Sequence, residues 1–329
     1  MEISKIVLGL IFAISLIALV NFVVVSMIPA PIVPISNCNY FIAANYYNSE
    51  KSLSYSLPEL KKLISYLNTG ENVYMSVYEN GSNDNTKGLL KDFEKDLEIP
   101  HKFVTCGSSG YGNWTVEKIL GEKHINKLYK LKPYFRYQRM AAIRNRALEP
   151  LYTKPFSNGF PIKVIFLNDI YFHAEDLLKL VHTNNGDFDI ACGLDFYYQF
   201  YDVLVTRDIE GYWFSGYYPF TRHPESQLAL KENKPFRVMS CWNGVIVLDA
   251  KGFLDHGIAF RGRKNNGESE CECQQSECLL VCSDFFKAGM QKIFINPEVR
   301  VSYEWKYFMM HNLHARNLAC IAQGYSHLN

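Results

Sequence analysis

The segment that most constrains the fold is residues 163–172, KVIFLNDIYF, where an apolar run ends in an Asn-Asp pair. A strand buried on both faces of a parallel sheet reads as a continuous apolar run, and ligands bind beyond the carboxyl ends of such strands. Asn168 and Asp169 would then stand at the ligand edge, where a carboxylate can hold a divalent cation on a diphosphate. Asn-Asp pairs also form ordinary turns, so this pattern alone leaves both interpretations open.

Apolar and amphipathic runs alternate along the first half of the chain. We expect strands at residues 40–44, 73–78, 101–105 and 163–167, and helices at 56–67, 86–97 and 136–148. The first helix would begin at the capping box Ser56-Leu57-Pro58-Glu59. The second half is less regular, with strands expected at 188–193, 237–239, 245–249 and 292–295 and a helix at 279–288. This order predicts an α/β fold with a mixed, mostly parallel sheet flanked by helices.

A long apolar segment, residues 6–28, follows Lys5, and no further basic residue occurs until Lys51. A helix over this range would be about 35 Å long, which is enough to cross a bilayer. The basic residue on one side only places the N-terminus in the cytosol. We therefore expect a cytosolic tail (1–5), a transmembrane signal anchor (6–28), a stem (29–38) and one lumenal domain (39–329). An atypical signal sequence is the alternative.

All nine cysteines follow this apolar segment, and such a number is typical of proteins in an oxidising compartment. Four cysteines form a cluster whose C-x-C and C-x4-C spacings fit zinc poorly. We expect disulfides there rather than a metal site. The cluster consists of Cys271, Cys273, Cys278 and Cys282.

The loop after the second expected strand, residues 79–86 (ENGSNDNT), is rich in turn-forming residues. A loop between strand and helix at the ligand edge can hold a nucleotide base, although it could also serve only to cap the next helix. If the loop contacts a nucleotide, a glycan on the sequon that begins at Asn80 would block nucleotide binding. Glycosylation is therefore expected at the second sequon, which begins at Asn113.

The expected helix at residues 136–148 carries several arginines just before the Asn-Asp strand. Arginine binds phosphate through two parallel hydrogen bonds, so Arg139 and Arg144, with the neighbouring Asn145, are candidates for binding a diphosphate. A solvated basic helix face is the alternative interpretation.

Five further residues could carry chemistry. Asp195 follows an expected strand, and Trp242-Asn243 forms an aromatic-amide turn between two others. Glu277 opens an apolar helix, where a carboxylate suits the positive end of the helix dipole and could also act simply as a cap. His311, near the C-terminus, could be a late metal ligand or an ordinary solvated histidine.

These segments, taken in order, resemble the fungal α-1,3-mannosyltransferases of glycosyltransferase family 69, the cryptococcal capsule-associated type. The resemblance runs from about residue 40 to residue 303. It rests on FIAANYYNSE (41–50), VYENGSNDNT (77–86), IRNRALEPL (143–151), FLNDIYF (166–172), ACGLDF (191–196), YDVLVTRDIEG (201–211), SCWNG (240–244), SECLL (276–280) and INPEVRVSY (295–303).

The resemblance implies a Golgi enzyme with a GT-A-like fold that transfers mannose from GDP-mannose to a mannoside through an α-1,3 linkage. Because GDP-mannose is α-linked, an α product means retention, which calls for a carboxylate or amide near the anomeric carbon. The donor would contact Ala44, Asn45, Glu79, Ser82, Asp84, Arg139, Arg144, Asn145 and Asn168. Asp169 and His311 would hold a divalent metal such as Mn²⁺, Trp242 and Asp208 would contact the acceptor, and Glu277, Asp195 or Asn243 would be catalytic.

The metal motif is Asn168-Asp169 rather than Asp-x-Asp, which is a departure from typical GT-A enzymes. A glycan-binding or scaffolding relative without activity is therefore the alternative, as is a transferase that uses another nucleotide sugar. With 34 Lys and Arg against 33 Asp and Glu, the chain lacks the charge of a nucleic-acid-binding protein.

Overall fold

The structure, a computed structural model, describes residues 34–106, 132–263 and 275–312. These residues all belong to one compact unit that begins at Pro34. The expected anchor at residues 6–28 and the sequon at Asn113 lie outside the described residues. In the part of the chain that is described, no helix is long and apolar enough to span a membrane.

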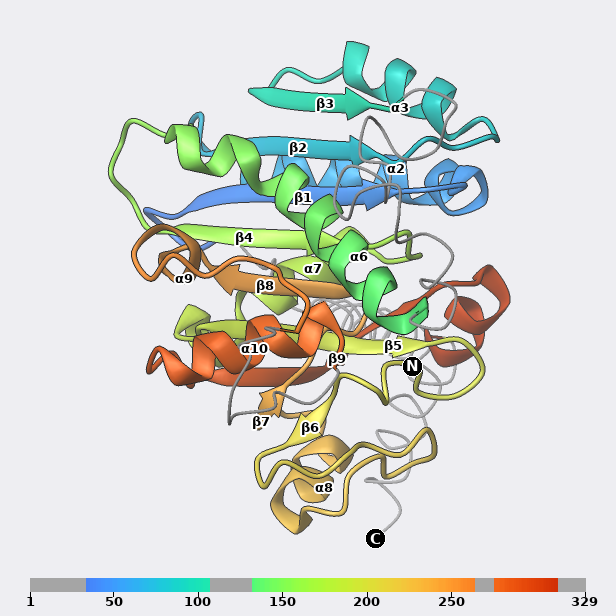
Figure 1. The fold of residues 1–329 in the computed structure, drawn as a ribbon, viewed down its shortest axis with the longest axis vertical. Helices are drawn as coiled ribbons and strands as arrows, with labels where there is room; N and C mark the ends of the chain where they lie inside the picture. Colours follow the sequence, from blue (N-terminus) through green and yellow to red (C-terminus); the bar gives the residue numbers. More distant parts are fainter. Residues whose placement is uncertain (1–33, 107–131, 264–274, 313–329) are drawn as a thin grey trace, which may run out of the picture. The chain divides into compact units, whose positions relative to one another are not determined.

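Within the described residues, nine strands form one mixed sheet in the order β3-β2-β1-β4-β8-β5-β9-β7-β6 (Figure 1). Four neighbouring pairs are parallel and four are antiparallel, so the sheet is less parallel than the sequence predicts. The strands are β1 (Asn39–Tyr46), β2 (Val73–Glu79), β3 (His101–Thr105), β4 (Ile162–Leu167), β5 (Ile190–Phe196), β6 (Arg207–Asp208), β7 (Phe236–Ser240), β8 (Val245–Asp249) and β9 (Ile293–Ser302).

Helices cover both faces of this sheet. α6 and α10 pack with one hydrophobic core, whereas α2, α3 and α7 pack with a second core on the opposite face. Alternate residues of β1 divide between the two cores, Phe41 and Ala43 facing one and Tyr40 and Ile42 the other. The helices are α2 (Glu50–Leu67), α3 (Thr86–Lys95), α6 (Lys132–Leu148), α7 (Ala174–Val181), α8 (Pro224–Lys231), α9 (Lys251–Leu254) and α10 (Glu277–Lys287), with 3-10 turns η3 (Glu149–Thr153) and η4 (Thr183–Gly186).

The prediction that the first helix begins at Ser56 is wrong. α2 begins at Glu50, and Pro58 lies inside it. The reason is burial: Leu53 is fully buried against the sheet, one turn before Leu57. This tertiary contact outweighs the helix-start signal of the Ser-x-Pro-Glu sequence.

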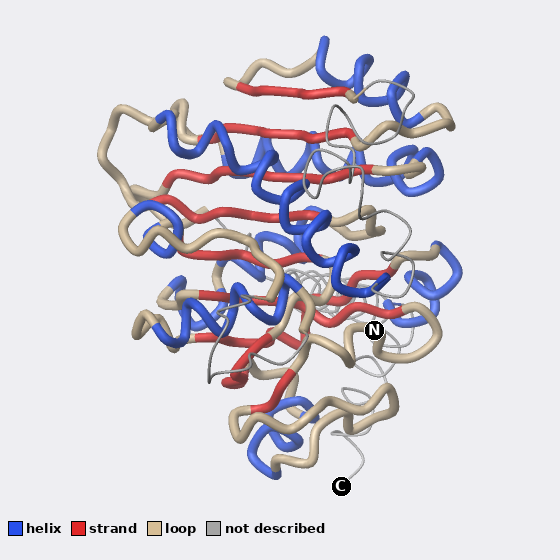
Figure 2. The backbone as a smooth tube through the Cα atoms, viewed as in Figure 1, coloured by secondary structure: helices blue, strands red, loops and turns tan. Residues whose placement is uncertain are grey.

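The strand directions bring distant segments to one edge of the sheet. β1, β2, β4, β5 and β9 run the same way, and β8 runs against them. The residues after β4, β5 and β9 therefore meet the turn before β8 at the right-hand edge of Figure 1. Figure 2 shows that the long segment between β5 and α8 is mostly loop.

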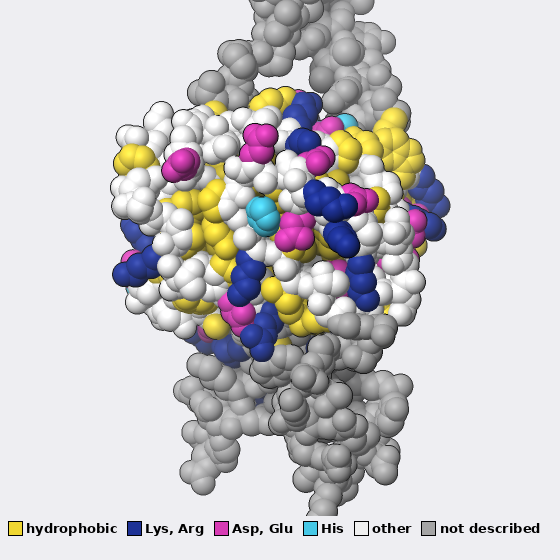
Figure 3. Space-filling model, turned by 90° about the horizontal axis from the view of Figure 1, so that it is seen from above, with side chains coloured by type: hydrophobic (Ala, Val, Ile, Leu, Met, Phe, Trp, Pro, Cys, Tyr) yellow, Lys and Arg dark blue, Asp and Glu magenta, His cyan; other side chains and the backbone are white. Residues whose placement is uncertain are grey.

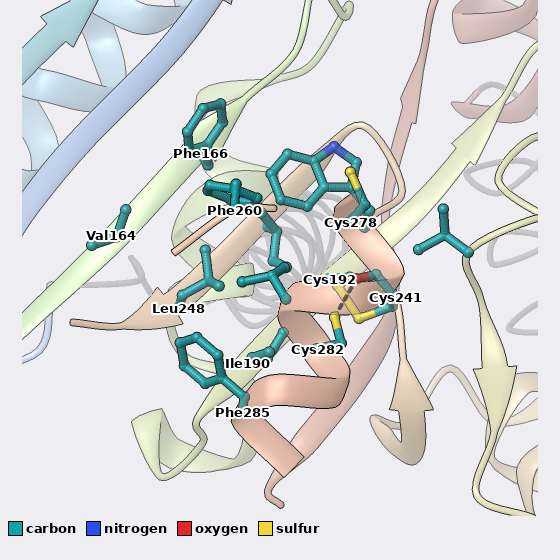
Figure 4. Packing of buried hydrophobic residues seen from close by; sticks show 14 of the residues in the cluster. Val164, Phe166, Ile190, Cys192, Cys241, Leu248, Phe260, Cys278, Cys282 and Phe285 are labelled. Carbon is teal, nitrogen blue, oxygen red and sulfur yellow. Dashed lines mark hydrogen bonds between the residues drawn. A yellow bond between two sulfur atoms is a disulfide. The ribbon is translucent and has the colours of Figure 1, made fainter. Parts of the chain in front are cut away.

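The described cysteines form one disulfide, between Cys192 on β5 and Cys241 after β7. Figure 4 shows this disulfide in the core beside α10, with Cys282 next to it. Cys278 and Cys282 are buried free thiols in the described part of the chain, so the prediction that they form disulfides is wrong. Both lie on the face of α10 that packs on the sheet, where they act as small apolar side chains. Cys271 and Cys273 lie outside the described residues.

Charges of both signs lie close together on the face seen in Figure 3, which looks onto the end of the sheet that carries β3 and α3. On α3, for example, the Lys95 ammonium lies 2.8 Å from the Asp92 carboxylate, and both side chains are exposed. Exposed pairs of this kind contribute little to stability.

Candidate active site

Arg144 of α6 is buried at the centre of the candidate site, with 4% of its surface exposed. Its Nε donates to Oε1 of Glu277 and its Nη1 donates to Oδ1 of Asn168, each at 3.1 Å. The guanidinium carbon lies 4.1 Å from the centroid of the Trp242 ring, a cation–π contact. The described residues supply no hydrogen-bond partner for Nη2. A donor group of this cation therefore remains for an anionic ligand.

Asn168 is fixed by contacts from three other elements. Its Oδ1 accepts from Arg144 and from Nε1 of Trp242 at 3.3 Å, and its Nδ2 donates to the hydroxyl of Tyr303 at 3.0 Å. Its backbone N–H donates to the carbonyl of Gly244 at 3.0 Å. The Asn-Asp pair is thus held in place rather than left as a loose turn.

Asp169, the next residue, remains partly exposed at the same edge. Burial raises the pKa of its carboxyl, while a bond from its own backbone and the positive charge of Arg144 act in the opposite direction. Burial raises the pKa of Tyr46, at the end of β1, and the negative charge of Asp169 raises it further. The carboxylate is therefore within the electrostatic influence of Arg144 and keeps exposed surface for a ligand.

Glu277 is the first residue of α10 and is almost fully buried. Ser276 caps the helix, its hydroxyl accepting from the N–H of Cys278 at 3.1 Å. The carboxylate thus has two stabilising partners, the helix N-terminus and Arg144. Ser276, rather than Glu277, is therefore the residue that caps α10, and the side chain of Glu277 bonds Arg144 instead.

Two acidic residues, the buried Asp195 and the half-buried Asp202, form a second group beside this network. Asp195 has no exposed surface, and its Oδ1 accepts from the N–H of Asp202 at 3.2 Å, whereas its Oδ2 has no partner among the described residues. Burial raises the pKa of Asp195, and the charge of Asp202 adds to this effect. Burial also raises the pKa of Asp202 to about 6, although its Oδ2 accepts from the N–H of Asn243 at 2.9 Å.

Asn243 closes this group, and both polar atoms of its amide are hydrogen-bonded. Its Oδ1 accepts from the Thr206 hydroxyl at 2.9 Å and its Nδ2 donates to the carbonyl of Gly193 at 2.7 Å. Its φ of 56° is in the left-handed region, which asparagine tolerates better than most residues. Asp202 is not among the residues singled out from the sequence, although it lies in the segment YDVLVTRDIEG (201–211). In the structure its backbone N–H contacts Asp195.

The predicted nucleotide loop is joined to the loop before α2 by several hydrogen bonds. The hydroxyl of Ser82 accepts from the N–H of Asn48 at 2.8 Å, and Asp84 accepts from the N–H of Glu50 at 3.1 Å. Thr86 accepts from the N–H of Ser49 at 2.7 Å. Ser82 and Asp84 therefore hold the loop in place.

Two buried oxygens at the ends of β1 and β2 have no hydrogen-bond partner among the described residues: Oδ1 of Asn45 and Oε2 of Glu79. The other oxygen of Glu79 accepts from the N–H of Ser82, and Nδ2 of Asn45 donates to the carbonyl of Ile143 at 3.1 Å. A buried acceptor without a donor is costly, so these two atoms mark a place where a ligand can donate.

The other predicted donor-binding residues are spread over several elements. Ala44 is buried within β1, and Arg139 is half-buried on α6. The side chain of Asn145 bonds both the N–H and the carbonyl of Phe260, at 3.0 and 2.8 Å, and thus holds the chain after α9 against α6.

The two predicted acceptor residues are both buried. Trp242 is 1% exposed and packs beneath Arg144. Asp208 holds a turn, its carboxylate accepting from the N–H groups of Glu210 and Tyr212 and from the hydroxyl of Thr221. Their contact with an acceptor stays a prediction.

The predicted metal ligands are Asp169 and His311. The His311 ring stacks on that of Phe196, with 3.8 Å between centroids. The described residues contain no group of three or more His, Cys, Asp or Glu placed to hold a metal. A Mg²⁺- or Mn²⁺-like ion can bind through one carboxylate together with substrate phosphates, and Asp169 fits that mode.

Two comparisons with known proteins identify the same family. A family model described as cryptococcal mannosyltransferase 1 matches residues 39–284. Alpha-1,3-mannosyltransferase CMT1 of Cryptococcus neoformans var. neoformans serotype D is 31% identical over 292 residues. The match covers 80% of this chain and 58% of the relative, so the chain spans less than two thirds of that protein.

Solved structures give weaker likenesses. The mannosyltransferase PcManGT from Pyrobaculum calidifontis, solved with GDP-Man and Mn²⁺, is 11% identical with a TM-score of 0.45, over 80% of this chain and 56% of that one. Residues 1–349 of S. aureus TarS are 12% identical with a TM-score of 0.41, over 80% and 60% of the two chains.

Proposed function

This chain belongs to the cryptococcal mannosyltransferase family, and we propose that it transfers mannose from GDP-mannose to a mannoside through an α-1,3 linkage, with retention of configuration and on a GT-A-like fold. The observation that carries the proposal is the buried Arg144, which is held by Glu277, Asn168 and Trp242 and lies near Asp169. A fixed cation beside a carboxylate suits the stabilisation of a departing diphosphate.

The guanine base would be recognised at the ends of β1 and β2. Guanine presents N–H donors on its pairing edge, and the unbonded oxygens of Glu79 and Asn45 are acceptors without donors in the described structure. The hydrogen bonds of Ser82 and Asp84 keep the adjoining loop in position. This part of the proposal accounts for two buried oxygens that the fold itself leaves unpaired.

The diphosphate would lie between Arg144 and Asp169. A divalent ion, Mn²⁺ in this proposal, would be held by Asp169 and the diphosphate, and it would neutralise charge on the leaving group. Nη2 of Arg144 would donate to the diphosphate. The contribution of His311 to the metal remains a prediction.

Among the three side chains predicted to be catalytic, Glu277 is the one bonded to Arg144. The amide of Asn243 is held inside the protein by Thr206 and Gly193, and burial favours the neutral form of Asp195 by raising its pKa. Glu277 is therefore the proposed carboxylate near the anomeric carbon.

The proposed location is the Golgi membrane, with residues 39–329 in the lumen. Support comes from the long apolar segment at residues 6–28 and from the Cys192–Cys241 disulfide, which suits an oxidising compartment.

The test uses the purified full chain with a panel of nucleotide sugars and a mannobiose acceptor, in Mn²⁺ or in EDTA. We expect transfer from GDP-mannose alone, lost in EDTA, and an α-1,3 linkage in the product. Asp169→Asn should lower kcat/KM at least about 100-fold, the scale of losing one electrostatic stabiliser. Asp92→Asn, which changes an exposed carboxylate on α3, is the matched control and should be unaffected.

Binding of mannobiose without consumption of any donor would refute the proposal in favour of a glycan-binding relative. Transfer from another nucleotide sugar would refute the choice of GDP-mannose. Transfer that continues in EDTA would refute the requirement for a divalent ion, while the proposed transfer reaction would stand.

A further inference from the structure

Tyrosines form a row that leads from the candidate site to the surface, and the proposed function assigns them no role. The row consists of Tyr303, Tyr201, Tyr197, Tyr307 and Tyr198. Tyr303, whose hydroxyl accepts from Asn168, has its ring centroid 5.0 Å from that of Tyr201. Tyr201 lies 6.2 Å from Tyr197, which lies 5.4 Å from Tyr307, and Tyr198 lies 6.1 Å from Tyr307. The rings come from two separate segments, the loop after β5 and the residues after β9, which Figure 1 shows at the same edge of the sheet.

These rings are open to solvent where the row leaves the site. Tyr201 is 51% exposed, Tyr197 45% and Tyr198 66%. A single exposed aromatic residue is ordinary, whereas a connected row that begins at the candidate site is typical of a binding surface. The buried Trp242, by contrast, has almost no surface to offer a ligand.

We propose that Tyr201, Tyr197, Tyr307 and Tyr198 bind the acceptor as an extended oligosaccharide, so that several sugar units beyond the reacting one are held on their rings. The inference rests on the proposed function, and it adds that the preferred acceptor is longer than a disaccharide.

The chemistry of the row favours a carbohydrate. The C–H face of a pyranose is apolar and slightly positive, and it packs on the negative face of an aromatic ring. Tyrosine also carries a hydroxyl that can bond the sugar hydroxyls around that face. Neighbouring rings of the row lie 5.0–6.2 Å apart between centroids and brace one another, which gives an extended sugar chain several aromatic contacts in succession.

The test compares two acceptors, α-1,3-linked mannobiose and mannotetraose, with the full chain. Tyr198→Ala and Tyr307→Ala should each raise KM for mannotetraose about tenfold, the change that 1.4 kcal/mol of binding free energy produces. KM for mannobiose and for GDP-mannose should stay unchanged, and Tyr198→Phe should restore mannotetraose binding. Tyr152→Ala, which removes a similarly exposed tyrosine (47%) from η3 before β4, is the control and should behave as the parent chain.

Binding of mannotetraose without donor, measured by calorimetry, separates this inference from the proposed function. Tetraose binding that weakens in Tyr198→Ala supports the tyrosine row even if the chain transfers nothing. An unchanged KM for mannotetraose, or an equal change for both acceptors, would overturn the inference. A change in oligomeric state with unaltered sugar binding would also overturn it, because the row would then be a protein contact.

Discussion

The Nε of Arg144 on α6 lies 3.1 Å from the carboxylate of Glu277 at the start of α10, and each side chain is only 5% exposed. The two residues are 133 positions apart in sequence. Burying two charges costs free energy that their attraction only partly offsets. The pair therefore suits a site that needs a fixed cation better than it suits a fold that needs only stability.

Glu277→Ala leaves the guanidinium buried without its carboxylate. We expect the free energy of unfolding to fall by about 3–5 kcal/mol, measured by denaturant unfolding. The double change Arg144→Met with Glu277→Leu removes both charges and should cost less than Glu277→Ala, while transfer is lost. A double variant less stable than Glu277→Ala would show that the pair is a net stabiliser of the fold.

Much of the sheet could be predicted because apolar runs and turns are local signals. The strand at Val245–Asp249 agrees residue for residue, and β3 likewise. β9, however, continues seven residues beyond its expected end at Ile295. Asn296 and Pro297 are signals for a turn, and they are tolerated because the strand pairs with β5 through an irregular register between Cys192 and Leu194.

The candidate site was predictable only in part. Asp169 and Arg144 were identified because charged residues next to a strand end or on one helix are visible in sequence. The bond between Arg144 and Glu277 was not visible, since it depends on how α10 crosses α6. The exposed tyrosine row was equally hidden, because no sequence pattern joins residue 201 to residue 303.

Glu79→Gln tests the proposed guanine contact. The side-chain oxygen that accepts from Ser82 is kept, whereas the unbonded Oε2 becomes an N–H₂ group. A donor facing the N–H groups of guanine leaves both unpaired, so KM for GDP-mannose should rise at least about tenfold. Steady-state kinetics with GDP as inhibitor measures this. A KM and a GDP inhibition constant equal to those of the parent chain would place guanosine elsewhere.

The Cys192–Cys241 disulfide joins β5 to the turn that carries Trp242 and Asn243. Because it closes a loop with a sequence separation of 49, removing it by Cys192→Ala with Cys241→Ala should lower the free energy of unfolding by up to about 4 kcal/mol. Denaturant unfolding measures the change. Peptide mapping without reductant should recover the linked pair and leave Cys278 and Cys282 as thiols; a bond from either thiol to Cys241 would contradict this pairing.

Asp202 links folding stability to pH. Its pKa is raised from 3.8 to about 6, chiefly by burial, so the folded protein binds this proton more tightly than the unfolded chain does. Between about pH 4 and pH 6 the folded state holds more protons, and the free energy of unfolding must fall as pH rises through that window. At about 1.4 kcal/mol per pKa unit, the loss is on the order of 2–3 kcal/mol.

Asp202→Asn should remove this loss, because the amide keeps an oxygen for the N–H of Asn243 but binds no proton. The variant should gain stability relative to the parent chain between pH 4 and pH 7, measured by denaturant unfolding at each pH. Asp255→Asn, an exposed change after α9, is the control. A difference between Asp202→Asn and the parent chain that is independent of pH would mean that Asp202 ionises in the fold as readily as in the unfolded chain.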